Sequence, residues 1–477
     1  MEFREERDAL GKKSVPSNAY YGIGALRSFE IFPSFDEKIN PRLIKAYLEV
    51  KKAAAETNYK TGLLFKEKYD AIEEAIEKLI IETENAIERK SFEIYEKIIV
   101  SPYQGGAGAS LNTNINEVIA NTALEILGEK FGEYSVVHPY DDVNMSQSTN
   151  DTFLTAFAIA AIRLLRELSS SQALLSNSLL EKAKEFQFIP KLGRTQYQDS
   201  TPLTLGQEFE AFAAAIERDR WRMVESEKSL LKTPIGGGAI GNSIGISKNY
   251  FDHILSAIKK ISKLPLERES NLIDQSKNLD RFEEVLGALR IAAGNLLKMA
   301  QDLMFLSSGP NGGIGEIILP ALLPTSSTMP GKINPAALEF AVQICSYSLG
   351  ISNSISSLLN AGALQNNPYL PLISHLFFKN IEFLQETYIL LSEYCIKGIK
   401  ANVENCRAHL LNSMALAPAL VPALGYDTVQ EICSYAAENK ITFLQALIKS
   451  KVISEMELYN LIYKELKIDI SEKGSSF

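Results

Sequence analysis

The sequence predicts a mainly α-helical protein organised around a bundle of long helices. Apolar residues recur with a helical period along five long segments that contain few capping residues: 152–185, 206–232, 276–306, 336–362 and 368–400. Strand signals are weak, because no Asn-Gly or Asp-Gly pair is flanked by alternating apolar and polar residues. Helical periods of this length favour an elongated bundle over a compact globule.

The part of the chain before the bundle mixes irregular and helical stretches. Prolines and glycines interrupt any period over residues 1–40, so this stretch is expected to be loop-like. A helical period starts at about residue 41 and is clearest over 67–99. Glycines at 105–108 break the pattern before a helix resumes, and another break covers 133–150.

The apolar character of two bundle segments also predicts that the protein forms oligomers. Residues 152–164 and 285–306 are apolar over much of the helix circumference, so they must be covered on several sides, which favours oligomerisation. After about residue 400, proline and glycine breaks indicate short helices. The predicted domains are an N-terminal domain, the central bundle and a small helical C-terminal domain, over 1–145, 146–400 and 401–477.

Composition excludes several classes of partner. The chain has 477 residues, 46% of them hydrophobic, which is enough for a large core and about two to four domains. Its net charge of −9 is spread without long runs of one sign, so neither nucleic acid nor a membrane surface is an expected partner. No apolar stretch approaches the roughly 18 to 20 residues of a membrane span, and no signal peptide is evident. A soluble cytoplasmic protein is expected.

Metal and redox sites are not expected. The four cysteines and four histidines are widely scattered, and no CxxC or HExxH pattern occurs. The cysteines are therefore expected to be buried thiols.

A segment at 324–335 has the composition of a mobile loop that carries chemistry. Two adjacent hydroxyls, Ser326 and Ser327, precede a Pro-Gly turn, Lys332 and Asn334. A serine can remove a proton only if its alkoxide is stabilised, and a tight turn with a nearby lysine supplies backbone N–H groups and a cation. Lys332 and Asn334 lie two residues apart and could grip one carboxylate. The alternative is an ordinary Ser/Thr/Pro loop.

Three further breaks are rich in neutral hydroxyls and amides next to predicted helix starts: 103–114, 138–151 and 193–208. Neutral donors and helix N-termini bind carboxylates without a metal, so these breaks suit a substrate with two anionic ends. Taken singly, each break could be turn and capping chemistry, with Ser148, Thr149 and Asn150 as N-caps. The occurrence of all three together with the loop at 324–335 favours a binding site.

The motifs also resemble a known family. The loop at 324–335 closely resembles the GSSxMPxKxNP signature of the aspartase/fumarase superfamily. Further matches follow the family's order from about residue 5 to 465. Four of them look like the aspartate ammonia-lyase branch: 19–23, 104–108, 116–121 and 148–151. Two more continue the match at the family's spacing: 193–196 and 207–209.

The resemblance implies an architecture and an assembly. Members of the family have a small mixed N-terminal domain, a central domain of long helices that forms a homotetrameric bundle, and a small helical C-terminal domain. Their active sites combine residues from three subunits and require no metal or organic cofactor. The substrate expected here is a small dicarboxylate or amino acid.

The resemblance also implies roles for individual residues. Ser326 is the expected general base, and Lys332 is expected to act with it. The α-carboxylate is expected to be bound by Lys332, Asn334 and Thr195. The charge on the second carboxylate is expected to be stabilised by Ser148, Thr149 and Ser327. The leaving amine is expected to face Asn150 and Gln196, and Ser110 is expected to bind substrate as well. The implied reaction is anti elimination of ammonia from L-aspartate through an aci-carboxylate, giving fumarate.

Some positions depart from the family pattern and keep alternatives open. Ala109 stands in place of a threonine whose hydroxyl is expected to contact the charge-bearing carboxylate, and its loss costs about 10²–10³ in rate if nothing replaces it. Thr325 replaces a glycine, Gln196 stands where most members have histidine, and four positions in 238–245 differ: Gly238, Asn242, Ser243 and Gly245. The alternatives are a carbon–nitrogen lyase for another amino acid, fumarate hydratase, or a catalytically silent homologue.

Overall fold

The computed structural model describes residues 2–324, 326–454, 456–458 and 460–461. It divides the chain into two compact units, each assembled from three stretches of sequence. The first unit comprises Met1–Leu168, Arg222–Arg290 and Ser348–Phe383, and the second comprises Ser169–Trp221, Ile291–Tyr347 and Leu384–Phe477. The division into three domains that the sequence suggests stays a prediction.

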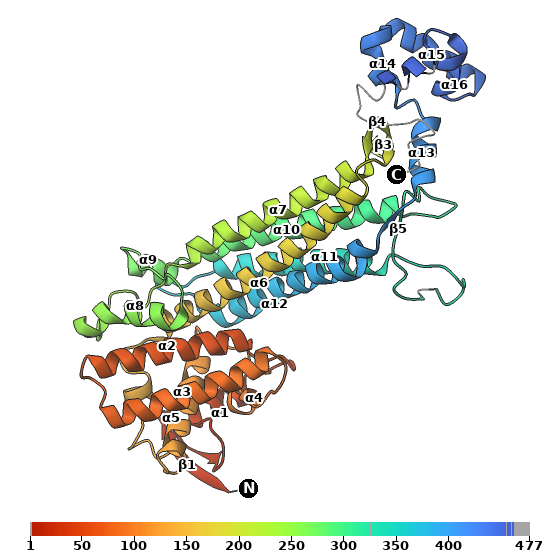
Figure 1. Ribbon diagram of the computed structural model, residues 1–477. Helices are drawn as coiled ribbons and strands as arrows, with labels where there is room; N and C mark the ends of the chain where they lie inside the picture. Colours follow the sequence, from red (N-terminus) through yellow and green to blue (C-terminus); the bar gives the residue numbers. More distant parts are fainter. Residues whose placement is uncertain (1, 325, 455, 459, 462–477) are drawn as a thin grey trace. The chain divides into compact units, whose positions relative to one another are not determined.

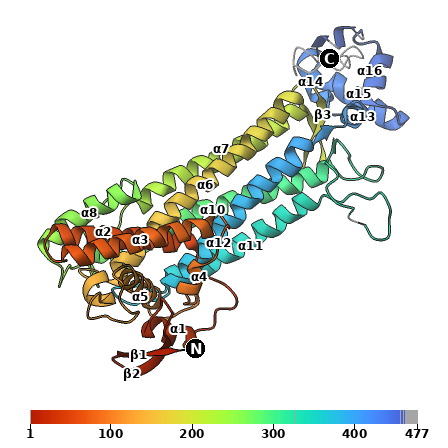
Figure 2. The same ribbon diagram turned by 60° about the horizontal axis from the view of Figure 1, so that its bottom comes forward.

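The first unit begins with a hairpin and a set of helices. Strands β1 (Phe3–Asp8) and β2 (Gly11–Pro16) pair antiparallel, with Arg4 opposite Val15. The elements that follow are α1 (Ile23–Ile31), α2 (Pro41–Lys60), α3 (Lys66–Ile87), α4 (Ile94–Lys97), α5 (Ala109–Ile126) and a π-helical turn over Pro139–Val143. Helices α2 and α3 lie side by side in both views (Figures 1 and 2).

The expectation of a loop over residues 1–40 is wrong, because this stretch holds β1, β2 and α1. The glycines in it mark close approaches rather than breaks. A Cβ on Gly22 would lie 2.7 Å from the Tyr134 hydroxyl, and one on Gly24 would lie 2.4 Å from Cγ2 of Thr113. These glycines let the start of α1 pack directly against α5.

The long helices predicted from sequence are confirmed. They are α6 (Thr149–Glu185), α7 (Leu205–Leu230), α10 (Asp280–Leu306), α11 (Ala336–Leu359) and α12 (Leu370–Leu390). In the first unit, the Phe157 ring of α6 stacks on Phe282 of α10 at 4.2 Å, and Phe377 and Phe378 of α12 meet it edge-on at 5.4 Å. This buried aromatic cluster joins three helices of the unit. The first unit also contains the shorter helices α8 (Lys248–Ser262) and α9 (Leu272–Lys277).

The second unit adds short strands and the C-terminal helices. Strands β3 (Pro190–Thr195) and β4 (Gln198–Thr204) form a hairpin, and β5 (Ile317–Ile318) pairs with β6 (Lys400–Ala401). After a π-helical turn (Leu391–Cys395) and a 3₁₀ turn (Ile396–Gly398) come α13 (Val403–Asn412), α14 (Ala417–Leu424), α15 (Tyr426–Asn439) and α16 (Phe443–Ser450). Helices α14, α15 and α16 gather around one apolar core that includes Leu420, Ile432 and Leu447 (Figure 2).

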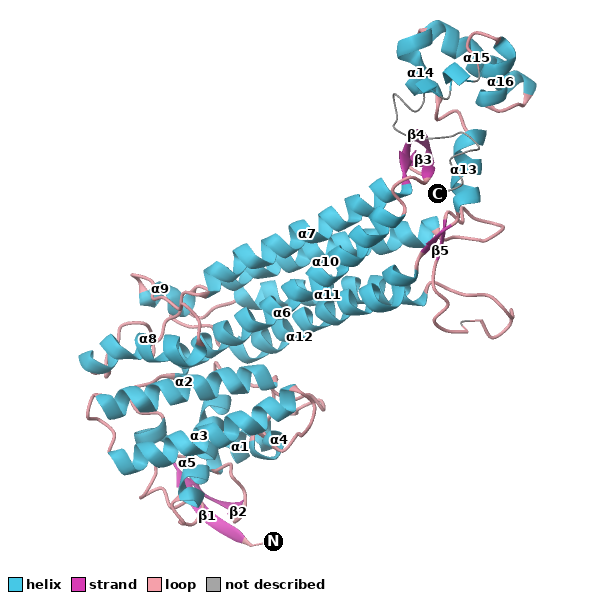
Figure 3. Cartoon of the chain, viewed as in Figure 1, coloured by secondary structure: helices cyan, strands magenta, loops and turns pink. Residues whose placement is uncertain are grey.

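The described residues form only three two-stranded sheets. Figure 3 shows that most of the chain is helical. The mainly α prediction is confirmed, although the sequence did not indicate the hairpins. No helix among the described residues is both long enough and apolar enough to span a membrane.

Candidate active site

A cavity of about 510 Å³ opens in the first unit where three polar segments converge. The start of α5, the residues that lead into α6, and the loop at 238–246 line it. Ser148 and Thr149 line it, as do Ala109 and Asn112. Two of the polar breaks recognised in the sequence therefore meet at one place, next to the N-terminus of α6.

Asp151 fastens the start of α6 to the facing loop. One of its carboxylate oxygens accepts the Ser148 N–H at 3.0 Å, and the other accepts the N–H groups of Gly236 at 3.1 Å and Gly238 at 3.0 Å. Burial raises the pKa of Asp151 to about 6, although these three hydrogen bonds act to lower it. The carboxylate thereby fixes the backbone that presents Ser148 and Thr149 to the cavity.

Asn150 takes part in the same connection. Its side-chain amide donates to the Ala239 carbonyl at 2.6 Å, which ties α6 to the loop a second time. The Ser148 hydroxyl accepts the Asn150 N–H at 3.3 Å, as an N-cap does. Capping and binding are therefore compatible at Ser148, whereas the Asn150 amide contacts the loop in this structure.

A second buried polar cluster supports the wall of the cavity. The Asn144 Oδ1 atom accepts hydrogen bonds from Lys51 at 2.8 Å, Asn112 at 3.1 Å and Asn116 at 3.2 Å. Lys51 is 1% exposed, and burial lowers the pKa of its ammonium to about 7, against the opposing effect of the Asp151 charge. This cluster places the amine of Lys51, with a pKa near 7, behind a cavity whose lining residues are all uncharged.

Helix α5 presents to the cavity a different set of side chains from the one that the family pattern predicts. Ala109 supplies only a methyl group at the first position of the helix. One turn later, the Thr113 hydroxyl lies 3.3 Å from the Tyr140 hydroxyl, and both residues line the cavity. Ser110, predicted to bind substrate, is not among the lining residues.

The structure accounts for two of the positions in the loop at 238–245 that differ from the family pattern. The Ser243 hydroxyl donates to the Gly236 carbonyl at 2.8 Å, and Ser243 itself has a positive φ of 55°. Asn242 accepts the Ile244 N–H through its side chain at 3.3 Å. Both side chains therefore stabilise the loop that Asp151 holds in place.

The remaining predicted site residues belong to the second unit. Thr195 and Gln196 lie at the exposed end of the β3–β4 hairpin, where Gln196 and Tyr197 both have positive φ, at 55° and 62°. This is the backbone of a tight two-residue turn. The Tyr197 ring packs on Phe305 at 4.9 Å, which anchors the turn to α10.

A buried ion cluster supports the same hairpin. The Glu316 carboxylate is fully buried and contacts Arg194 at 2.8 Å, His409 at 3.0 Å and Lys191 at 3.2 Å. Burial acts to raise the pKa of Glu316, but the bond from Arg194 and the charge of Lys191 outweigh it and hold the pKa below its usual value. The cluster links the hairpin, β5 and α13.

The loop at 324–335 also lies in the second unit. The Ser326 hydroxyl accepts the Met329 N–H at 2.9 Å, and the Lys332 N–H donates to the Met329 carbonyl at 3.3 Å. Gly331 has a positive φ of 85°, as the predicted turn requires. Ser327 and Lys332 are exposed, Asn334 is half-buried, and Thr325 lies outside the described residues.

Comparison with known proteins identifies the family. A family model described as lyase matches residues 11–350. Aspartate ammonia-lyase of a Bacillus species is 38% identical over 459 residues, which cover 96% of each chain, and that of Pseudomonas aeruginosa is 38% identical over 97% of this chain and 96% of its own. The chain belongs to the aspartase/fumarase superfamily. It is a carbon–nitrogen lyase.

Solved structures agree with this assignment. A fumarate lyase:delta crystallin from Brucella melitensis, bound to cobalt, superposes with a TM-score of 0.91 at 40% identity and covers 97% of this chain and 98% of its own. A class II fumarase from Schistosoma mansoni gives 0.87 at 25% identity, with coverage of 97% and 98%. The superfamily fold predicted from the motifs is confirmed.

Sequence reasoning missed the groups that hold the superfamily motifs in place. Asp151 stood within a recognised motif but was given no role, although an acidic residue in the first turn of a helix is a usable signal. Lys51 and Asn144 gave weaker signals, because their hydrogen bond joins α2 to a turn 93 residues away. No group of three or more potential metal ligands occurs among the residues that the structure describes.

Proposed function

We propose that the protein eliminates ammonia from L-aspartate to give fumarate. The observation that carries the proposal is the cavity at the start of α6, where Asp151 presents Ser148 and Thr149 among neutral donors. Similarity to aspartate ammonia-lyases over nearly the whole chain supports the choice of substrate. The serine, lysine and asparagine of the loop at 324–335 supply the remaining groups that the reaction needs.

The chemistry follows from the acidity of the substrate. Ser326 removes a proton from Cβ, and the electron pair moves into the adjacent carboxylate to form an aci-carboxylate. Hydrogen bonds from Ser148, Thr149 and Ser327 stabilise this charge, which is where most of the rate acceleration is expected. The pair then returns to form the Cα–Cβ double bond, and the amine leaves from Cα as ammonia.

The other groups hold the ends of the substrate. In this proposal Lys332, Asn334 and Thr195 bind the α-carboxylate, and Gln196 with Asn150 faces the leaving amine. Asn150 must then exchange its bond to the Ala239 carbonyl for one to the substrate, or contribute through its backbone. Ser110, which follows Ala109 on α5, contributes further substrate binding in this proposal.

We further propose that the enzyme is a homotetramer whose active sites combine residues of three subunits. The proposed site residues are divided between the two units of the chain, on α6 in one and on a hairpin turn and a loop in the other. The apolar helices of the bundle supply surfaces that oligomerisation would cover.

A second candidate substrate has one specific observation in its favour. Ala109 leaves the first turn of α5 without a hydroxyl, while Tyr140 and Thr113 place two hydroxyls further along the same wall. An amino acid with a bulkier or longer group on Cβ would occupy this space. The similarity to a class II fumarase keeps fumarate hydration as a third reaction to assay.

The test is a substrate panel. Purified protein is incubated with L-aspartate, L-malate and a set of other amino acids, while ammonia release and the absorbance of the conjugated product are followed. Turnover of L-aspartate that falls by about 10²-fold or more in Ser326→Ala is expected. Turnover of another amino acid in place of L-aspartate would contradict the substrate. Activity that survives Ser326→Ala would contradict the base, and no turnover with any compound would indicate a silent homologue.

A further inference from the structure

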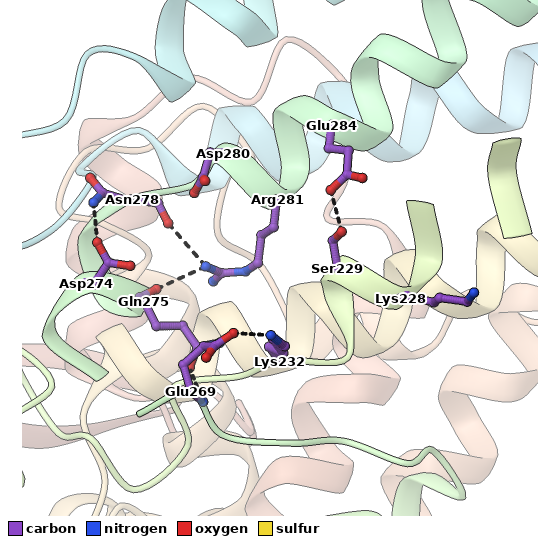
Figure 4. Close-up of a pocket in the computed structure, with 10 residues that line it drawn as sticks. All are labelled: Lys228, Ser229, Lys232, Glu269, Asp274, Gln275, Asn278, Asp280, Arg281 and Glu284. Carbon is purple, nitrogen blue, oxygen red and sulfur yellow. Dashed lines mark hydrogen bonds and ion pairs between the residues drawn. The ribbon is translucent and has the colours of Figure 1, made fainter. Parts of the chain in front are cut away.

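A second cavity of about 530 Å³ lies elsewhere in the first unit. The end of α7, Glu269, α9 and the start of α10 surround it (Figure 4). Its lining shares no residue with the cavity at the start of α6. The proposed reaction uses none of its side chains.

Arg281 of α10 projects into the middle of this group of residues (Figure 4). Its Nη1 atom donates to the backbone carbonyls of Gln275 at 3.1 Å and Asn278 at 3.2 Å. The Nε and Nη2 atoms are buried and have no hydrogen-bond partner within the described part of the chain. Those two atoms form one edge of the guanidinium, the edge that accepts a carboxylate through two parallel hydrogen bonds.

The unpaired edge is costly as it stands. Burial lowers the pKa of Arg281 to about 10, although the charges of Asp280 and Asp274 act to raise it. A buried donor without an acceptor destabilises the fold, and more so when it is charged. An anion on this edge would remove that cost.

The other cations at the cavity already have partners. Lys232 forms an ion pair with Glu269, and Lys228 pairs with Glu225 at 2.6 Å. Among the described residues that line the cavity, the charges without an ion-pair partner are the Arg281 guanidinium and three carboxylates: Asp274, Asp280 and Glu284. Asp274 accepts a hydrogen bond from Asn278, and Glu284 accepts one from Ser229. The charges of Asp274 and Asp280 act on Arg281, so one positive and two negative groups influence one another at this cavity.

We propose that this cavity binds a small zwitterion of the α-amino acid type. The ligand's carboxylate lies on the Nε–Nη2 edge of Arg281, and its ammonium group faces Asp274 and Asp280. The two acidic side chains repel a dianion such as phosphate, so they select a ligand that brings its own positive charge. Because both atoms are buried, binding in this proposal requires the Arg281 guanidinium to turn this edge toward the cavity.

Binding is tested directly, without turnover, by calorimetry with glycine, acetate, methylammonium and inorganic phosphate. Glycine is expected to bind the wild-type protein more tightly than any of the other three. Arg281→Gln should weaken glycine binding about tenfold or more, because it removes both charge-assisted hydrogen bonds. Lys228→Gln, at the rim of the same cavity, should leave it unchanged.

A second variant keeps the test decisive if Arg281→Gln folds poorly. Asp280→Asn retains Arg281 but removes a partner of the ammonium group, so it should weaken glycine and strengthen acetate. Acetate or phosphate that binds as tightly as glycine in both proteins would overturn the zwitterion assignment. Glycine binding that persists in Arg281→Gln, or no glycine binding up to about 10 mM, would overturn the site. None of these results depends on whether L-aspartate is the substrate.

Discussion

At the scale of single residues, Asp151 determines how the hydroxyls at the start of α6 are presented. Replacement by Asn turns one acceptor oxygen into an NH₂ group that faces backbone N–H donors. We expect Asp151→Asn to lower the free energy of unfolding by about 2–4 kcal/mol, because a buried group that accepts three hydrogen bonds is disrupted. Denaturant unfolding measures this change.

The same variant should also lose activity. We expect kcat to fall about tenfold or more, since Ser148 and Thr149 are no longer held in place. The control is Asp70→Asn, which removes only an exposed ion pair with Lys66 and should change stability by less than about 0.5 kcal/mol. Wild-type kcat in Asp151→Asn would contradict a positioning role.

The buried side chain of Lys51 should make the free energy of unfolding depend on pH. Burial lowers its pKa to about 7, whereas the unfolded chain titrates near 10.4, so the unfolded state holds more protons between these values. The contribution of Lys51 to stability therefore rises with pH from about 7 to 10. Lys51→Met should remove this rise, and melting curves of both proteins at several pH values between 6 and 10 measure the difference. A constant difference over that range would contradict the lowered pKa.

Ala109 offers a test of substrate choice. Ala109→Thr returns a hydroxyl to the first turn of α5, beside the cavity. If the substrate is L-aspartate, kcat/KM for it should rise, by up to about 10²-fold. If the substrate has a bulkier Cβ group, kcat/KM should fall, because the added side chain occupies its space. Ala437→Thr, at an exposed position of α15 that does not line the cavity, serves as the matched control.

At the scale of elements, α5 is flanked by two glycines in the left-handed region. A Cβ on Gly108, with φ of 89°, would lie 2.4 Å from the Phe153 ring, whereas one on Gly128, with φ of 75°, would meet nothing within 4 Å. Gly108→Ala should cost roughly 2–4 kcal/mol, from backbone strain and overpacking together. Gly128→Ala should cost only the strain, about 1 kcal/mol. Equal losses in thermal unfolding would show that the Phe153 ring moves away at no cost.

The elements also show how far the sequence could predict the fold. The long helices were recognisable because their apolar residues repeat over many turns. The β3–β4 hairpin was not, because its turn is formed by Gln196 and Tyr197 rather than by Asn-Gly. The β1–β2 hairpin was missed for a different reason: its strands lack a buried apolar face that would show in the sequence. In β1, Glu6 is the only buried residue.

The candidate site also contains residues that the sequence could predict and residues that it could not. Motifs that are continuous in sequence, such as the loop at 324–335, could be recognised from the residues alone. Lys51 and Asn144 could not, because each depends on a contact between distant segments. The chemistry of the site was therefore predictable, whereas the groups that fix its geometry required the structure.

At the scale of the whole molecule, the distribution of the proposed site residues predicts complementation between inactive variants. Ser148→Ala alters the first unit and Ser326→Ala the second, and each protein alone should be nearly inactive. Suppose that one site takes Ser148 and Ser326 from different subunits and that equal amounts of the coexpressed variants assemble at random. Half of the sites then receive an intact Ser148 and, independently, half receive an intact Ser326. We expect about a quarter of wild-type activity. Measurement of kcat on the purified mixture tests this.

A matched pair within one loop separates this explanation from others. Ser326→Ala and Lys332→Ala both alter the segment at 324–335, so no subunit in their mixture carries an intact loop. That mixture should stay inactive at the same total concentration and in the same oligomeric state. Recovery there would point to stabilisation of one variant by the other rather than to shared sites. Failure of the first mixture, in assemblies shown to contain both chains, would place both residues of each site on one subunit.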